Sequence, residues 1–480
     1  MLSLLNAALA SPTANVVLTL AWLVIALCVT ADVLLTKSDV RGALGWIAAA
    51  WLSPILGGTL YFLFGINRVT RRALKLTRRG RRKAWPAHGA PPVLDDNITQ
   101  LAEVSDKVIG GERTGGNRLT PLNGGDEAYP EMLAAIAGAR KGVVLASYIF
   151  RNDEAGRRFV EALVAARARG VEVRVLLDSV GGGYLYSGVL RALRRGGVPV
   201  QRFLHTWLPW RMPFLNMRNH RKLLVVDGRL AFTGGMNIGA ENCRSLHADA
   251  ISDIHFRLEG PAVREVMAVF AHDWDFTTGE VLDDAFWWPD LAPAQPGGNA
   301  HLRGLSSGPD ADLYKLEAML GAAISLARSR VRIVTPYFLP DARLQFVIAQ
   351  AALRGVTVDI VLPHKSDQRL MDWAMAAHLR FFRHVGARFH ATPGPFDHSK
   401  LATVDGQWCL IGSSNWDARS FRLNFEFDLE CYGEEVTAMV DQAIEARIAG
   451  AQARTPEEML ARPAWMRLRD AAARLMMPYL

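Results

Sequence analysis

Cysteine is scarce in this chain of 480 residues, which contains only Cys28, Cys243, Cys409 and Cys431. Their spacing forms neither a C-x-x-C pair nor a disulfide framework. We therefore expect buried, reduced thiols in a protein that faces the cytosol. The sequence also lacks a cluster of metal-ligand residues, and it predicts neither a metal nor another cofactor.

Acidic residues are outnumbered by basic ones. The 55 lysines and arginines against 47 aspartates and glutamates give a formal charge of +8. Such a balance favours an anionic partner, which is either a phospholipid surface or a nucleic acid. Composition does not choose between the two.

Charge is nearly absent from two long apolar runs near the N-terminus. The first, residues 14–35, has Asp32 as its one charged residue, and the second, residues 42–66, has none. At about 1.5 Å per residue the first run would form a helix roughly 33 Å long, enough to cross a hydrocarbon core. Pro54 would kink the second run. The sequence predicts a two-helix transmembrane hairpin over residues 1–66.

Basic residues are absent before the first run, which argues against a signal peptide. They gather instead in a predicted juxtamembrane linker over residues 67–96. By the positive-inside rule, this linker and the chain after it should lie on the cytoplasmic side of the membrane. The linker either rests on anionic headgroups or is solvated and only sets the topology.

From residue 97 onward, strand-like runs alternate with helical stretches, the pattern of an α/β protein. Three segments recur in the same order: 141–153 with 329–341, 170–178 with 355–363, and 219–237 with 397–415.

These matches predict two related halves, residues 97–290 and 300–450, joined by a proline- and glycine-rich stretch. We expect each half to be a mixed sheet flanked by helices, with a pseudo-twofold axis between them. Residues 451–480 are predicted to form a C-terminal amphipathic helix.

Each half contains H-x-K-x4-D, then six intervening residues and G-[GS]-x-N. The members are His220, Lys222, Asp227, Gly234, Gly235 and Asn237 in the first half, and His398, Lys400, Asp405, Gly412, Ser413 and Asn415 in the second. A single H-x-K arises often by chance, but two full copies at the same place in a repeat are a specific signal.

Strand periodicity predicts how these side chains point. Residues two positions apart share a face, so His220 and Lys222 should point the same way, and the second copy should repeat this. Asp227 and Asp405 have the opposite parity. We expect both to be structural, hydrogen-bonding the backbone or the turn that follows.

One pocket holding two imidazoles, two ammonium groups and two amides would suit a phosphodiester. One imidazole can attack phosphorus, while the other protonates the leaving alkoxide and later deprotonates the incoming alcohol. Lysines and amides can bind the non-bridging oxygens. The candidates for phosphate binding are Asn237, Asn415 and Ser413.

A neutral imidazole is usually held in one tautomer by a carboxylate. Asp253 and Glu426 occupy equivalent places, each seven residues before a glycine. We expect Asp253 to orient His220 and Glu426 to orient His398. Acids in surface salt bridges are the alternative.

Residues 218–239 and 398–426 resemble the two signature motifs of the phospholipase D superfamily, and more narrowly those of bacterial cardiolipin synthases. The apolar N-terminus is similar to that of the membrane-spanning members. The resemblance implies a multi-pass protein of the bacterial inner membrane. It also implies a catalytic set formed by His220, Lys222, Asp227, His398, Lys400 and Asp405.

The implied reaction converts two phosphatidylglycerols into cardiolipin and glycerol through a phosphatidyl-histidine, without a metal or cofactor. His220 would be the nucleophile and His398 the general acid and base. The implied partners are phosphatidylglycerol and other anionic membrane lipids, not nucleic acid. Phosphatidylethanolamine as the second donor stays open, as do three other functions: a lipid hydrolase, a nuclease and an inactive scaffold.

Overall fold

The computed structural model describes residues 12–37, 40–65, 92–111, 113–206, 217–290, 298 and 300–477. The chain forms two compact units, Met1–Arg72 and Ala73–Leu480. The predicted linker over residues 67–96 lies outside the described residues as far as residue 91.

The first unit contains α2 (Pro12–Thr36), α3 (Val40–Leu52), α4 (Pro54–Leu60) and the π-helical turn η1 (Tyr61–Gly65). Within the described ranges, one helix is long and apolar enough to cross a membrane, over Asn15–Thr36. The second apolar run is divided into α3 and α4 because Pro54 cannot continue the preceding helix. The second span of the predicted hairpin is therefore not confirmed, although Trp51 donates a hydrogen bond to Thr30 of α2.

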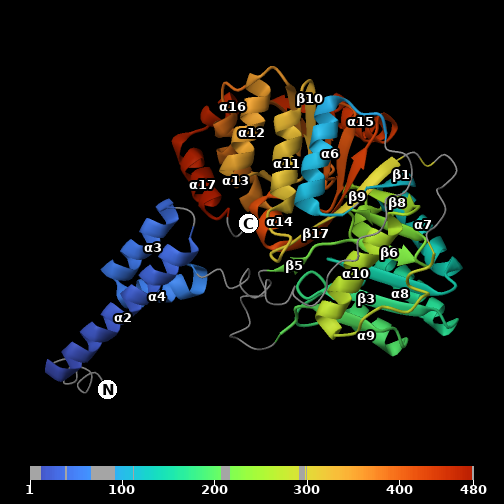
Figure 1. The fold of residues 1–480 in the computed structure, drawn as a ribbon, viewed down its shortest axis with the longest axis horizontal. Coiled ribbons are helices and arrows are strands. Elements are labelled where there is room, and N and C mark those ends of the chain that lie inside the picture. The colour runs from blue at the N-terminus through green and yellow to red at the C-terminus, as the bar shows by residue number, and fades with distance from the viewer. Residues whose placement is uncertain are drawn as a thin grey trace. The chain divides into compact units, whose positions relative to one another are not determined.

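The second unit is built around one large mixed sheet (Figure 1). The elements from its first part are β1 (Thr114–Asn123), α7 (Gly124–Gly138), β2 (Gly142–Ser147), α8 (Glu154–Ala168), β3 (Glu172–Asp178), α9 (Gly188–Arg195), β4 (Val200–Phe203), β5 (Arg218–Asn219), β6 (Leu223–Val226), β7 (Leu230–Gly234), η4 (Ala240–Asn242), β8 (Ile254–Glu259) and α10 (Val263–Thr278).

The second part repeats this succession with additions. Its elements are β9 (Ala300–Ser307), α11 (Lys315–Leu326), β10 (Arg330–Val334), β11 (Phe338–Leu339), α12 (Ala342–Leu353), β12 (Thr357–Pro363), α13 (Arg369–Leu379), η5 (Arg380–Phe382), β13 (Arg388–Thr392), β14 (Leu401–Val404), β15 (Trp408–Gly412), β16 (Trp416–Asp417), α14 (Ala418–Arg422), β17 (Asn424–Tyr432) and α15 (Glu434–Ala449).

The strand order is symmetric about the centre of the sheet. It runs β4-β3-β2-β6-β7-β8-β1 in the first half and continues β9-β17-β15-β14-β10-β12-β13 in the second. The central strands β1 and β9 pair antiparallel, whereas β2 with β3 and β10 with β12 pair parallel. The order of the second half mirrors that of the first, as expected for two copies of one fold.

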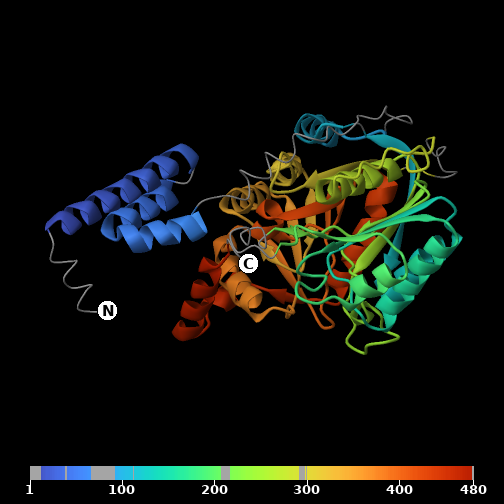
Figure 2. The same cartoon turned by 90° about the horizontal axis from the view of Figure 1, so that it is seen from below.

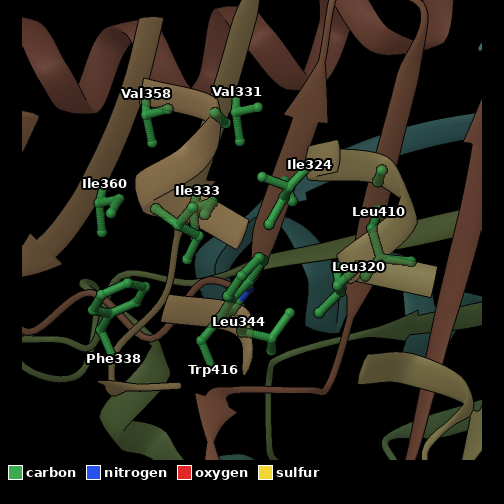
Figure 3. Packing of buried hydrophobic residues seen from close by; sticks show 14 of the residues in the cluster. Leu320, Ile324, Val331, Ile333, Phe338, Leu344, Val358, Ile360, Leu410 and Trp416 are labelled. Atoms are coloured by element: carbon green, nitrogen blue, oxygen red, sulfur yellow. The ribbon is translucent and has the colours of Figure 1, made fainter. Parts of the chain in front are cut away.

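Helices lie on both faces of the sheet (Figure 2), so its inner strands are buried on both sides. This explains why β2 and β14 are apolar runs rather than alternating ones. In the second half, Leu320 and Ile324 of α11 belong to the same buried cluster as Ile333 of β10 (Figure 3). The first half has its own core cluster.

Helix α6 (Asp96–Ile109) lies at the predicted start of the first half, residue 97, but it does not pack on that half. It precedes β1 in the chain, yet Ile98 and Leu101 are fully buried in the core cluster of the second half. The Asn97 side chain donates to Leu326 O and to Asp405. The apolar face of α6 therefore belongs to the second half.

The C-terminal part is not the single helix predicted over residues 451–480. It consists of β18 (Gln452–Arg454), which pairs with β13, then α16 (Pro456–Leu460) and α17 (Ala464–Leu475). Proline stands at the first position of α16 and immediately before α17. Because proline suits a helix start and disrupts a helix interior, these prolines divide the segment.

Candidate active site

The segment leading into each motif histidine crosses to the opposite half. Strand β5 pairs parallel with Asn424 and Phe425 of β17, and the His220 N–H donates to Phe425 O at 2.9 Å. In the second motif, Asp397 forms an isolated parallel β-bridge with Ser252, and the His398 N–H donates to Ser252 O at 2.7 Å. Each histidine is thus held by its backbone beside the acid of the other half.

This crossing decides which carboxylate orients which ring. His220 Nδ1 lies 2.8 Å from Glu426 Oε2, and His398 Nδ1 lies 3.0 Å from Asp253 Oδ2. The predicted pairing of Asp253 with His220 and of Glu426 with His398 is therefore wrong. The residues were correct, but each acid serves the ring of the other half, because the two motifs interlock at the centre of the sheet.

The pair of His220 and Glu426 is buried, whereas the His398 ring is 14% exposed over a buried Asp253, and each pair holds a neutral imidazole against a carboxylate anion. Burial, reinforced by Lys222 and outweighing Glu426, lowers the pKa of His220 to about 4, and burial with Lys400 lowers that of His398. Burial opposes ionisation of Glu426, but His220, Lys222 and Ser413 together outweigh it and the pKa of Glu426 falls. With Nδ1–H donated to the acid, Nε2 is the atom that carries the free lone pair.

Ser413 is not a phosphate ligand in this structure, contrary to the prediction. Its hydroxyl donates to Glu426 Oε2 at 2.6 Å, and the Asn424 side chain donates to Oε1 at 3.0 Å. At the equivalent position of the first half stands Gly235, where a Cβ atom would lie 2.6 Å from Asp253 Oδ1. These two positions therefore accommodate the orienting acids rather than the substrate.

Both histidines line one cavity of about 400 Å³, as the predicted pseudo-twofold arrangement requires. Asn237 and Asn415 line it too, although they lie beyond the ends of β7 and β15 rather than on those strands. Asn237 Oδ1 accepts from the Ile149 N–H, whereas Asn415 Oδ1 has no partner among the described residues. The unpaired Asn415 Oδ1 is an acceptor and is available to a hydroxyl or N–H donor of a ligand, whereas only Nδ2 of this amide could donate to a phosphate oxygen.

The motif lysines are buried next to the motif histidines, and neither is among the residues that line the cavity. Lys222 Nζ donates to His220 O at 2.6 Å, and Lys400 Nζ donates to His398 O. Burial lowers the pKa of Lys222 to about 7 and that of Lys400 to about 8. Each lysine also lowers the pKa of both histidines, so all four groups share one electrostatic environment.

The motif aspartates do not line the cavity, as their parity predicted. Asp227 accepts hydrogen bonds from the N–H groups of Arg140, Lys141 and Gly142 at the start of β2. Asp405 accepts equivalent bonds from residues 328–330 at the start of β10. Both anchor neighbouring strands, so the catalytic role that the resemblance implied for these two aspartates is not supported by contact with the cavity.

The sequence reasoning assigned no role to several residues that line the cavity. Arg218 and Arg419 bring positive charge to it, and Tyr148 packs edge-on against His220, with ring centroids 4.9 Å apart. Tyr337 donates to Asp367 beside them. The sequence could have predicted that Arg218 lines the cavity. It stands two residues before His220, and residues two apart in an extended segment share a face.

Comparisons with known proteins identify the family of the chain. The family model described as cardiolipin synthase, PLD-like domain, matches residues 132–274 and 320–448. The chain is 29% identical over 463 residues to the major cardiolipin synthase ClsA of Bacillus subtilis (strain 168), covering 92% of this chain and 95% of that protein. It is 31% identical over 413 residues to cardiolipin synthase 1 of Bacillus anthracis, covering 82% and 80%.

Among solved structures, the fold is similar to phosphatidylserine synthase of Haemophilus influenzae Rd KW20. The TM-score is 0.61 at 14% identity, covering 79% of this chain and all of that one. At this identity the likeness concerns the fold alone. The family model and the Bacillus relatives decide the family: the chain belongs to the bacterial cardiolipin synthases of the phospholipase D superfamily and is a phosphatidyltransferase.

Proposed function

We propose that this enzyme makes cardiolipin by transferring the phosphatidyl group of one phosphatidylglycerol to a second, with release of glycerol. The observation that carries the proposal is the placement of two carboxylate-held imidazoles, His220 and His398, on one cavity. The names of the Bacillus relatives support the choice of product.

In the first half-reaction, Nε2 of His220 attacks the phosphorus of the first phosphatidylglycerol. The bond between phosphorus and the glycerol headgroup oxygen breaks, and His398 donates a proton to that oxygen, so glycerol leaves. His398 must be protonated for this step. The entering phosphodiester anion supports this by favouring the cationic form of the ring.

In the second half-reaction, the now neutral His398 accepts a proton from a glycerol hydroxyl of the second phosphatidylglycerol. The oxygen attacks phosphorus, the P–N bond to His220 breaks, and cardiolipin forms while both histidines return to their starting states. Asp253 and Glu426 fix the tautomers and stabilise positive charge on the rings.

The remaining groups stabilise the charge on phosphorus oxygens. We assign Asn237 and Asn415 as hydrogen-bond donors to these oxygens. Lys222 and Lys400 place positive charge close beneath them. Arg218 and Arg419 suit the anionic headgroup of the second lipid, because both line the same cavity.

We also assign the enzyme to the bacterial inner membrane, with its catalytic unit on the cytoplasmic side. Support comes from the membrane-length helix over Asn15–Thr36 and from the basic residues that follow the apolar runs in the sequence. The lipid substrates of the relatives' reaction are themselves membrane components, so an anchored enzyme meets them without leaving the surface.

One assay tests the chemistry directly. Purified enzyme is incubated with phosphatidylglycerol vesicles, and the lipids and released glycerol are quantified. Cardiolipin and glycerol in equal amounts are the expected products. Phosphatidic acid as the main product would mean that water is the acceptor and would overturn the proposed transfer.

A further inference from the structure

Helix α17 turns its large apolar side chains outward. Trp465, Leu468 and Leu475, which fall on one helix face, are 61%, 74% and 74% exposed. The inward side instead holds Ala473 and Asp470, and Asp470 accepts hydrogen bonds from Arg462 and Arg469. An amphipathic helix normally buries its apolar face, so this reversed orientation leaves an apolar surface that lacks a partner within the described part of the chain.

The surroundings of this face are basic and aromatic. Residues 462–475 contain four arginines and a single acid, the buried Asp470. The Arg469 guanidinium lies 4.4 Å from the ring centroid of Trp373 on α13 and 5.6 Å from that of Trp465. Arginine and tryptophan side chains side by side are typical of surfaces that meet lipid headgroups.

A cavity of about 420 Å³ lies beside α17, between α13 and strands β12 and β13. Its walls are apolar at Met375, Phe389 and Met466. The charged lining residues are Lys365, Arg454, Arg462, Arg469 and a single acid, Asp372, so the cations are in excess. An apolar hollow with cationic groups fits part of an anionic amphiphile. This second observation favours lipid over a protein partner.

The face is close to the catalytic cavity through α13. Met371, near the start of α13, lines the catalytic cavity, and Trp373, two residues later, lines the second cavity. Helix α17 packs along α13. A bilayer in contact with α17 would therefore lie near the place where lipid must enter.

We propose that the outward face of α17 docks onto an anionic lipid bilayer. Trp465, Leu468 and Leu475 would enter the interfacial region, and the neighbouring arginines would bind headgroup phosphates. A second copy of the chain fits this face of α17 less well than an anionic bilayer does. In a twofold dimer through this face, the arginines of one copy would meet those of the other and repel.

The test is a fluorescent label on the full-length enzyme in vesicles. Cys28 is the exposed thiol among the described residues and is replaced by serine, while Cys243, Cys409 and Cys431 are buried. A single cysteine is then introduced as Leu468→Cys and labelled with an environment-sensitive dye. The matched control is Glu161→Cys, an exposed position on α8 of the first half.

The protein is reconstituted into phosphatidylcholine vesicles with or without phosphatidylglycerol, each containing a lipid-borne nitroxide quencher. We expect the dye at position 468 to be quenched at least about twofold more than the dye at 161, with the difference larger when phosphatidylglycerol is present. A second label, Leu475→Cys, should behave like the first.

Equal quenching at 468 and 161 would overturn the proposal. So would a dye at 468 that is shielded from both lipid and aqueous quenchers and crosslinks to a second copy, since that marks a protein interface. Because the readout needs no catalysis, its failure leaves the proposed function standing, and a failed lipid assay leaves the docking result standing.

Discussion

The imidazole of His220 and the carboxylate of Glu426 are 206 residues apart in sequence and 2.8 Å apart in the structure. The contact joins the first half of the protein to the second, and Asp253 with His398 forms its counterpart. Neither half therefore contains both a motif histidine and the carboxylate that contacts it. This arrangement makes the predictions below specific to residue pairs that cross the halves.

Replacing Glu426 with glutamine should reduce kcat by about 100-fold or more, because an amide neither fixes the tautomer nor stabilises the imidazolium as a carboxylate does. The measurement is cardiolipin formation under saturating lipid. Ser413→Ala, which removes one donor to Glu426, should cost about tenfold or less. Equal losses in the two variants would show that Ser413 does more than hold the acid.

His220→Ala and His398→Ala should both abolish turnover, but they should differ in what they accumulate. With His220 as nucleophile, the His398 variant still forms some phosphatidyl-enzyme but lacks the base that resolves it, whereas the His220 variant forms none. Mass spectrometry of the protein after incubation with phosphatidylglycerol measures the adduct. An adduct on residue 398 in the His220 variant would reverse the assignment of roles.

Asp227→Asn should act on stability rather than chemistry. The amide oxygen accepts fewer of the backbone N–H bonds that Asp227 accepts now, and we expect a loss of about 1–3 kcal/mol in the free energy of unfolding. Activity per folded molecule should stay within about threefold of the parent. Urea denaturation and steady-state kinetics on the same preparation separate the two effects. A variant with parental stability and no activity would contradict the structural role.

The pH dependence should reveal the motif lysines. Burial lowers the pKa of Lys222 to about 7 and that of Lys400 to about 8 in the free enzyme. As pH rises through this range, the lysines lose the charge that attracts the anionic lipid, so kcat/KM should fall. Bound phosphate favours the ammonium form and raises both pKa values, so kcat should persist to higher pH.

Rates measured between about pH 6 and 9 test this difference. The control is Lys107→Met, an exposed position on α6, which should leave both profiles unchanged. If kcat and kcat/KM fell together at the same pH, the titrating group would not respond to bound phosphate, and the assignment to the buried lysines would fail.

Much of the site could be predicted from the amino-acid sequence alone. The repeated motif identified both histidines, and the strand parity of Asp227 and Asp405 predicted that they bind backbone rather than line the cavity. The duplicated segments predicted two related halves, and the sheet has the corresponding mirrored order. These inferences depend on spacing and periodicity, which a short stretch of chain determines by its own geometry.

Other features were decided by tertiary structure. The exchange of orienting acids depends on β5 pairing with β17, a contact between distant segments that no local pattern encodes. The same holds for Ser413, whose hydroxyl is taken by Glu426, and for α6, whose apolar face packs on the second half. An amphipathic pattern indicates that one face of a helix will be buried. Which surface buries it depends on how the helices and the sheet pack in the complete fold. For this reason the sequence by itself determined the candidate catalytic groups, and only the fold determined how they are paired.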